Sequence, residues 1–403
     1  PWRGLYQKGR DGLIRKNFKK WNLFLLAGLF LLSCFFVSPE KSENAEFFFF
    51  RFPFIRYFAL NQFLTLATIL ILSAYLMETR VLSYLTYPLL RFCRTRKGLM
   101  YGLILVSYGI ALLFGTSISL YFTLPLSTIT LGREEDSPFL FIHCFSLQII
   151  AAELGSILFP YTSLSEFYLF LQFHYSLFDY FRISFLFFVF SILFLLPYVF
   201  CFSKEENKAL SSEVIERLEN GYTALKGGGA TRHHFLFPFC FFSFLLLCSC
   251  LGLIPITLCF SLLLSYTLLF RREVLGRIDY FLLLFIFLIF LIRGNLLNLY
   301  TIPELLTEYI QGHEASHSLI LSQIFTRLPA SIILADLTTK GRQLIIASIL
   351  SAIHPLALNY SGVIAYSMMK NRVHKKIFIL HYLFLHMQML LLFVFLAFFT
   401  GNL

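Results

Sequence analysis

Apolar residues fill most of this chain in long runs that short polar segments separate. About 20 consecutive apolar residues are enough for a helix to cross the hydrocarbon core of a bilayer. The runs therefore predict an all-α polytopic membrane protein. The predicted crossings lie near residues 22–37, 59–77, 139–158, 181–202, 234–251, 253–270, 278–297, 343–358 and 377–399.

Two further apolar runs, 99–131 and 303–338, are interrupted near their middles by small polar residues, and each is followed by a second broken run. In hydrocarbon every backbone N–H and C=O must be hydrogen-bonded within the protein, so irregular backbone at that depth survives only where it lines a cavity. Such breaks at corresponding positions of two halves are typical of the binding site of a secondary transporter. The pattern predicts two inverted repeats, each with a re-entrant helical hairpin and a broken transmembrane helix. The four broken segments are 112–127, 151–166, 322–337 and 347–362.

The composition strengthens the membrane assignment. Of the 403 residues, 58% are hydrophobic and 14% are charged, whereas about 25% of the residues in soluble domains are charged. The net charge of +11 would suit a nucleic-acid partner, but the Lys and Arg residues lie at the ends of apolar runs. Basic residues in that position mark cytoplasmic loops and favour contact with anionic lipid. We therefore expect membrane lipid as a partner and no nucleic acid.

The basic clusters also predict an orientation. A cytoplasmic N-terminus places all four clusters on the inside, with the first hairpin opening from the inside and the second from the outside. The N-terminal apolar run has no small-residue cleavage site, so we expect an uncleaved first crossing of a multi-pass protein in the inner or plasma membrane. The clusters are residues 3–20, 91–97, 271–277 and 370–376. The predicted parts are a basic cytoplasmic N-terminus (1–21), a first repeat (22–203), a cytoplasmic linker (204–233) and a second repeat (234–403).

Two segments in the second half, 277–299 and 311–368, carry a resemblance to a known family. The stretch SQIFTRLPA at 322–330 is similar to a family S-Q-x-x-S-N-x-P-A hairpin, and 151–170 is similar to an A-N-L-G-S-x-x-T-P-x-G-N-P-Q-N run. A family T-N-D turn corresponds to Gly115, Thr116 and Ser117. Over about residues 15–400 the chain thus resembles permeases of the ion transporter superfamily, which includes citrate-transporter-like, divalent-anion:sodium symporter and arsenite-pump proteins.

The resemblance implies an inverted-repeat carrier that moves a small anion by a rocking or elevator motion, often with Na⁺ or H⁺ as the coupling ion. Dimers are common in similar proteins, so a homodimer is one expected state. The chain departs from the family where Asn residues become Thr116, Glu153, Ser163, Glu166 and Arg327, and where a Gly-rich stretch becomes Ser351, Ala352 and His354. These departures remove oxygens and bare backbone that coordinate Na⁺. The candidate residues for substrate or ion binding are Gly115, Thr116, Ser117, Glu153, Gly155, Ser156, Thr162, Ser163, Thr326, Arg327, Pro329, Ser351, His354 and Asn359.

Among these candidates, hydroxyls at the first break can bind a carboxylate beside the positive end of a helix dipole. The alternative is that they only bond to neighbouring helices, as Ser and Thr often do in membranes. Glu153 and Arg327 are each flanked by apolar residues, and a charge at this depth normally faces a cavity or a partner. We expect the two to face one another, with Arg327 replacing a coupling cation or clamping an anion. The alternative is that the Arg327 side chain extends to the membrane surface and that Glu153 pairs with a residue close to it.

Two histidine-containing segments suggest further chemistry. His354 beside Pro355 is either a proton relay or a buried, hydrogen-bonded side chain. His313, Glu314 and His317 fit H-E-x-x-H, the metalloprotease pattern in which two His residues one helical turn apart bind zinc. That segment also matches the family's G-x-E spacing, and the sequence offers no convincing third zinc ligand.

The expected function is secondary active transport of a small anion, with a di- or tricarboxylate as the leading substrate class, by alternating access and Na⁺ or H⁺ coupling. No nucleotide-binding loop is present in the sequence. We expect no enzyme activity and no cofactor. Arsenite or oxyanion efflux, Na⁺/H⁺ exchange, a membrane zinc metalloprotease and a relative that no longer transports remain as alternatives.

Overall fold

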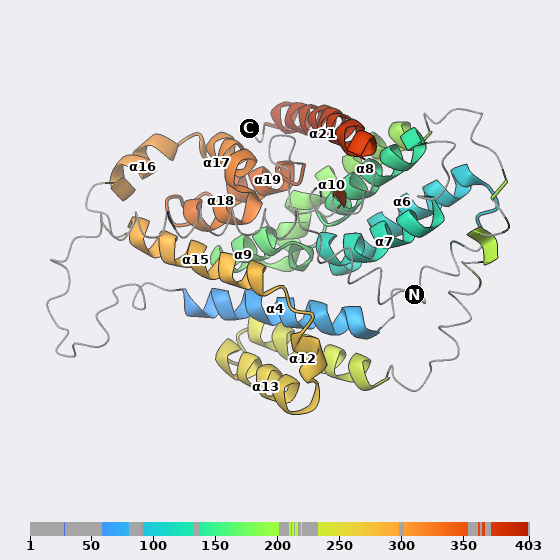
Figure 1. Ribbon diagram of the computed structural model, residues 1–403. Coiled ribbons are helices and arrows are strands. Elements are labelled where there is room, and N and C mark those ends of the chain that lie inside the picture. Colours follow the sequence, from blue (N-terminus) through green and yellow to red (C-terminus); the bar gives the residue numbers. More distant parts are fainter. Residues whose placement is uncertain are drawn as a thin grey trace, which may run out of the picture.

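The fold was examined in a computed structural model, shown in Figure 1. The described residues are 28, 59–79, 90, 92–131, 138–200, 209–210, 212, 214–216, 219, 233–297, 302–353, 362, 365–366 and 372–401. Within these residues the protein is nearly all helical and contains no strand. The first predicted crossing and most of the predicted linker lie outside the described residues.

The described part of the chain contains sixteen helical elements with defined bounds. They are α4 (Leu60–Thr79), α6 (Arg96–Phe114), α7 (Thr116–Thr130), α8 (Pro138–Gly155), η2 (Pro160–Thr162), α9 (Leu164–Gln172), α10 (Leu177–Phe200), α12 (His233–Cys250), α13 (Ile256–Phe270), α14 (Arg272–Leu275), α15 (Tyr280–Leu297), α16 (Ile302–Ile310), α17 (Glu314–Phe325), α18 (Arg327–Leu334), α19 (Gly341–Leu350) and α21 (Arg372–Phe399).

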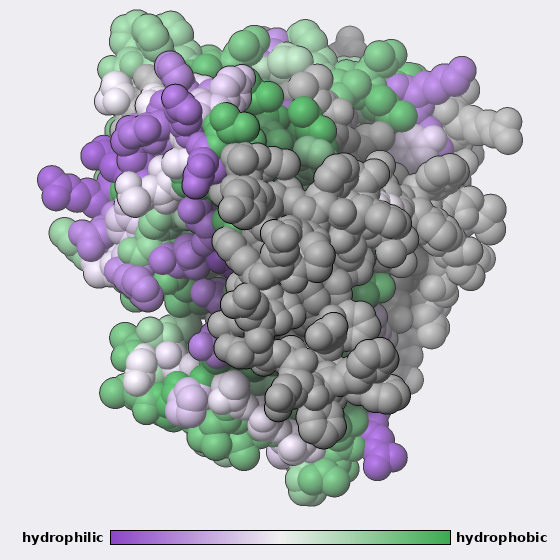
Figure 2. Space-filling model, turned by 90° about the vertical axis from the view of Figure 1, so that its left-hand side faces the viewer, coloured by the Kyte–Doolittle hydropathy of each residue, from purple (hydrophilic) through white to green (hydrophobic). Residues whose placement is uncertain are grey.

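The helices confirm an all-α protein of membrane type. Five helices of the described part, α4, α6, α10, α15 and α21, are long and apolar enough to cross a bilayer. Large hydrophobic side chains are exposed along α10, α12, α13 and α21, as expected where the surrounding medium is lipid and not water. Figure 2 shows one face of the molecule, with hydrophobic side chains at its upper and lower ends and hydrophilic side chains gathered along its left edge.

Both interrupted runs fold as pairs of helices joined by a single non-helical residue. In the first, Gly115 separates α6 from α7, and the Ser107 hydroxyl lies 3.1 Å from that of Thr123. These residues are equally far from the break, so the two helices run antiparallel as a hairpin. In the second, Thr326 separates α17 from α18. The run 303–338 therefore contains more than the expected hairpin, because the separate helix α16 precedes it.

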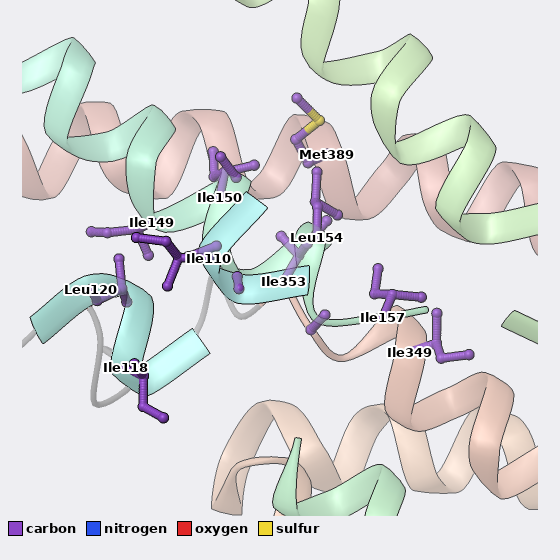
Figure 3. Close-up of a cluster of buried hydrophobic side chains, with 14 of the residues drawn as sticks. Ile110, Ile118, Leu120, Ile149, Ile150, Leu154, Ile157, Ile349, Ile353 and Met389 are labelled. Carbon is purple, nitrogen blue, oxygen red and sulfur yellow. The ribbon is translucent and has the colours of Figure 1, made fainter. Parts of the chain in front are cut away.

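Each hairpin packs against the helix that follows it in sequence. Helices α6 and α7 contact α8, and α17 and α18 contact α19. Helix α9 then packs against both α18 and α19, which brings the two halves of the chain together. The shared core includes Leu154 of α8 and Ile349 of α19, together with Ile157 and Ile353, which follow these helices, as Figure 3 shows.

A second group of helices lies on the far side of α4 from the hairpins (Figure 1). Here α12, α13 and α14 pack on α4 around a smaller apolar cluster that contains Leu72 and Leu263. The Tyr75 hydroxyl of α4 lies 3.0 Å from the hydroxyl of Thr267 of α13 within this otherwise apolar contact. Interhelical hydrogen bonds of this kind stabilise helix packing in lipid.

At one end of α6 the chain contacts the start of the predicted linker. Thr95 and Ala209 form an isolated antiparallel bridge, in which the Leu210 amide donates to the Arg94 carbonyl at 3.0 Å. Residues 91–97 and the linker were predicted to share one side of the membrane, and this contact is consistent with that placement.

Candidate functional site

The tip of the first hairpin rests on the chain that follows α8. Gly115 has φ 91° and ψ 164°, a conformation that is essentially restricted to glycine. A Cβ atom built on Gly115 would lie 2.3 Å from the carbonyl oxygen of Thr162. Glycine is required here both by the backbone angles and by the close approach of Thr162.

Hydroxyl groups tie this tip to the end of α8. Thr116 Oγ1 lies 2.9 Å from Ser156 Oγ, and Ser156 Oγ donates to the Glu153 carbonyl at 2.8 Å. Thr162 Oγ1 donates to the Ser156 carbonyl at 2.6 Å. Gly155 lets the turn approach α6, since a Cβ there would lie 2.5 Å from the Tyr108 carbonyl oxygen. The structure thus brings together five predicted site residues: Gly115, Thr116, Gly155, Ser156 and Thr162.

The tip of the second hairpin has nearly the same backbone conformation as the first. Thr326 has φ 75° and ψ 165°, close to the angles of Gly115. A β-branched residue in this region is a true stereochemical outlier. The next residue, Arg327, begins α18 and directs its guanidinium to Glu166 of α9, with Nη1 3.3 Å from Oε1.

The expected pairing of Arg327 with Glu153 is wrong. Arg327 pairs with Glu166, and Glu153 pairs with His386 of α21, with Oε2 3.3 Å from Nε2. Glu166 was identified in the sequence only as a departure from the family pattern. The geometry explains the difference: Glu153 lies at the end of α8, before the turn, whereas Glu166 lies on α9, which packs directly on α18.

A buried polar layer surrounds the Arg327–Glu166 pair. The Ser348 hydroxyl of α19 donates to Glu166 Oε1 at 3.0 Å, and the Ser165 hydroxyl lies 2.7 Å from those of both Ser331 and Ser348. The side chain of Glu166 is 1% exposed and that of Arg327 is 15% exposed. Glu166 Oε2 is buried and has no hydrogen-bond partner within the described part of the chain. One acceptor of this layer is therefore left for another donor.

Both hairpin tips lie against the same segment, residues 156–166. The first tip contacts Thr162 and the second contacts Glu166, about one helical turn further along the chain. Breaks from the two halves that are far apart in sequence thus meet at one short stretch. This stretch supplies hydroxyl groups and the Glu166 carboxylate, and Arg327 of the second tip adds a guanidinium beside them. Such groups bind small anions and cations.

The remaining predicted residues fall into three groups. Pro329 is buried within α18, and Ser351, at the end of α19, hydrogen-bonds through its hydroxyl to that of Ser322 of α17. Ser117 is exposed and Ser163 is the N-cap residue of α9. His354 and Asn359 lie outside the described residues, so their expected roles stay predictions.

The H-E-x-x-H segment lies at the start of α17. His317 Nδ1 donates to the His313 carbonyl at 2.9 Å, and Glu314 forms an ion pair with Lys340 at 3.2 Å. Burial acts to raise the pKa of the Glu314 carboxyl, but backbone N–H groups and the Lys340 ammonium outweigh burial and hold this pKa below its usual value. Glu314 is thus held as a paired carboxylate, which does not suit a general base. In the part of the chain that the structure describes, no group of three ligands of the metal-binding type occurs.

Sequence reasoning missed a second buried ion pair. Arg293 of α15 forms two hydrogen bonds with Asp336, one of them from Nη2 to Oδ1 at 2.7 Å, and Gln172 Nε2 donates to the same carboxylate oxygen at 3.1 Å. A lone Arg near the end of an apolar run was the available signal. This pair joins α9 and α15 to the residues after α18.

Comparison of the sequence with known protein families and with curated proteins gives no match.

Proposed function

We propose that this protein is a secondary transporter of a small anion, with di- and tricarboxylates as the leading substrate class. The observation that carries the proposal is that two broken hairpin tips meet at one segment, where the Arg327 guanidinium of the second tip pairs with the buried Glu166 carboxylate. Broken helices near a membrane midplane are the usual building blocks of carrier sites, because their unpaired backbone groups bind ions. The resemblance to the ion transporter superfamily points to the same class of function.

The proposal includes an inverted repeat. In each half a hairpin with a left-handed tip is followed by a helix that ends at a serine, and that serine bonds to a hydroxyl of its own hairpin. Ser156 and Ser351 are the corresponding serines. In this arrangement the hairpins are re-entrant and open to opposite sides of the membrane, and alternating access follows from exposing one tip or the other.

Arg327 is the proposed anion-binding residue. A guanidinium binds a carboxylate through two parallel hydrogen bonds, and such bonds are strong where water is excluded. Without substrate, Glu166 neutralises Arg327. An entering anion competes with Glu166 for the guanidinium, while Ser348 continues to donate to the Glu166 carboxylate. Proton or Na⁺ coupling compensates the charge of the anion.

The test is uptake of radiolabelled citrate, succinate and arsenite by purified protein in liposomes, under Na⁺ and pH gradients. We expect Arg327→Asn to abolish uptake and the exchange Arg327→Glu with Glu166→Arg to restore part of it. The matched control is Arg277→Asn, which removes an arginine from an ion pair with Glu78 that is 26% and 23% exposed. This control should retain wild-type uptake.

Uptake by Arg327→Asn at the wild-type rate would refute the role of Arg327. Absence of uptake of all three solutes by the wild-type protein, under every gradient, would refute transport of this class and favour a relative that no longer transports. His313→Ala distinguishes a carrier from a metalloprotease. A carrier should keep wild-type uptake in this variant, whereas a metalloprotease would lose a zinc ligand.

A further inference from the structure

The contact between α8 and α21 contains a buried carboxylate–imidazole pair that the proposed anion site does not use. Glu153 Oε2 lies 3.3 Å from His386 Nε2, and the side chains are 1% and 0% exposed. Ionisable groups buried at this depth are costly in a membrane protein and commonly belong to ion or proton pathways. We therefore expect this pair to have a functional role in addition to packing.

The hydrogen bonds of His386 fix how many protons the pair holds. Nδ1 lies 2.9 Å from the Tyr382 carbonyl oxygen, which can only accept, so Nδ1 carries a proton. The contact between Nε2 and Glu153 Oε2 then requires one more proton, because a bare ring nitrogen and a carboxylate oxygen are both acceptors. That proton lies on the carboxyl or on the imidazole. In either form the pair is neutral overall and holds one exchangeable proton that belongs to both residues.

Among the described residues that approach this pair from neighbouring helices, the ionisable side chains are tyrosines. On α21, the Tyr382 ring lies against that of His386, with centroids 3.8 Å apart and ring planes tilted by 31°. Tyr108 of α6 approaches Gly155 through its backbone, and the Tyr180 hydroxyl of α10 donates to the Ile157 carbonyl at 3.0 Å. Helix α7 contributes the hydroxyl of Thr116, which lies 3.3 Å from the Ala152 carbonyl oxygen. These neighbours are all uncharged in their ordinary forms near neutral pH.

The pair is connected to the first hairpin tip through the end of α8. Ser156 donates to the backbone carbonyl of Glu153 and is itself bonded to Thr116, the residue after Gly115. Losing the shared proton leaves two acceptors facing each other, which repel and shift the end of α8. A change in protonation is therefore transmitted to the tip of the first hairpin by direct hydrogen bonds.

We propose that Glu153 and His386 form the proton-binding site of the carrier, which makes H⁺ the coupling ion. This inference rests on the proposed transport function and adds the identity of the coupling site. One proton enters from water on the side to which the site is open, is held between Oε2 and Nε2, and leaves to water on the other side. Binding breaks an O–H bond of hydronium and forms an O–H or N–H bond on the pair, release reverses this, and no bond between heavy atoms changes.

The experiment uses liposomes that contain the full-length protein, and compares two modes of citrate transport. The first is accumulation driven by an imposed proton gradient, and the second is exchange of labelled for unlabelled citrate with no gradient. We expect Glu153→Gln to lose gradient-driven accumulation and to keep exchange. The Gln amide donates to His386 Nε2 and so resembles the proton-loaded pair. The matched control is His381→Gln, which removes the hydrogen bond between His381 and His143 in the same α8–α21 contact and should keep both modes.

Each outcome is decisive. Gradient-driven accumulation by Glu153→Gln at the wild-type level would overturn the proton site, while leaving the transport proposal intact. Loss of both modes in His381→Gln as well as in Glu153→Gln would also overturn it, because the contact would then be only structural. If the wild-type protein shows neither mode with citrate, succinate or arsenite, the proposed function fails.

Discussion

At the scale of single residues, Thr326 has the least favourable backbone of the described chain. Its φ of 75° is one of two positive values among the described non-glycine residues, the other being that of His174. The corresponding residue of the first hairpin tip is Gly115, for which these angles cost little. The second tip therefore holds strain that the first does not. Strained backbone of this kind is found at binding sites and persists only where the surrounding packing enforces it.

Thr326→Gly should raise the stability of the folded protein. Removing the side chain relieves backbone strain of order 1–3 kcal/mol. Glycine also increases the conformational entropy of the unfolded chain, which offsets about 0.4–1 kcal/mol of this gain. The measurement is the thermal unfolding midpoint in detergent, which should rise. The control Thr339→Gly, at an exposed position with no positive φ, should lower the midpoint slightly. A fall in both variants would show that the backbone at Thr326 is not strained.

Some residues of the site could be predicted from sequence and others could not. The break at Gly115 was predictable because small polar residues interrupt an apolar run there, and Thr116 and Ser156 lie beside that break. The partners of the buried charges were not predictable. Glu153 and His386 are 233 positions apart and Arg327 and Glu166 are 161 apart, so only the packing of α8 on α21 and of α9 on α18 brings them together.

At the scale of helices, the first hairpin depends on close backbone contact at its tip. Gly115 lies over the Thr162 carbonyl, and the hydroxyls of Ser107, Ser119 and Thr123 join α6 to α7 across the hairpin. Small residues of this kind let helices approach closely in a membrane, where the hydrophobic effect does not hold helices together. Close backbone approach and hydrogen bonds thus hold the hairpin together in addition to its apolar contacts.

Gly115→Ala should destabilise the protein by at least about 2 kcal/mol, because the new methyl group meets the Thr162 oxygen and the backbone angles are unsuitable for alanine. The matched control is Gly109→Ala in the same hairpin, where a Cβ has nothing within 4 Å. That change should leave stability unchanged or raise it by up to about 1 kcal/mol. Thermal unfolding in detergent measures both variants, and equal midpoints would contradict the close approach at the tip.

Helix positions were largely predictable from the apolar runs. The predicted crossing 278–297 agrees with α15 (Tyr280–Leu297), and 253–270 agrees with α13 (Ile256–Phe270). The segment 303–338 was predicted less well, because α16 is amphipathic and its apolar residues merge with those of the hairpin in a simple hydropathy profile. An apolar run indicates that a segment is buried in lipid or in protein, but it does not indicate where the chain turns.

At the scale of the whole molecule, the outer surface of the helices is apolar and matches a lipid environment. Helix α12 exposes Phe237, Phe241 and Phe244 beside the exposed thiol of Cys240. An exposed thiol in water would react readily with a maleimide, whereas a thiol facing lipid meets neither water nor a water-soluble reagent.

A water-soluble maleimide should therefore leave Cys240 unmodified when the protein is in liposomes. Mass spectrometry should detect the same number of labels for the wild type and for Cys240→Ser. Thr339→Cys, at an exposed position between α18 and α19, should add one label per chain. One label fewer in Cys240→Ser would place α12 in water and would contradict a lipid-facing surface.

The stretch from Ser156 to Glu166 has a consequence for how such a protein can change over evolutionary time. It supports the first tip through the Thr162 carbonyl and the second through the Glu166 carboxylate. One residue inserted just ahead of Glu166 would turn that side chain by about 100° around α9 and carry it away from Arg327. Deletion of one residue would turn the Glu166 side chain by the same angle in the opposite direction. The length of this stretch is therefore expected to be fixed, since any change would release one tip while the other stayed in place.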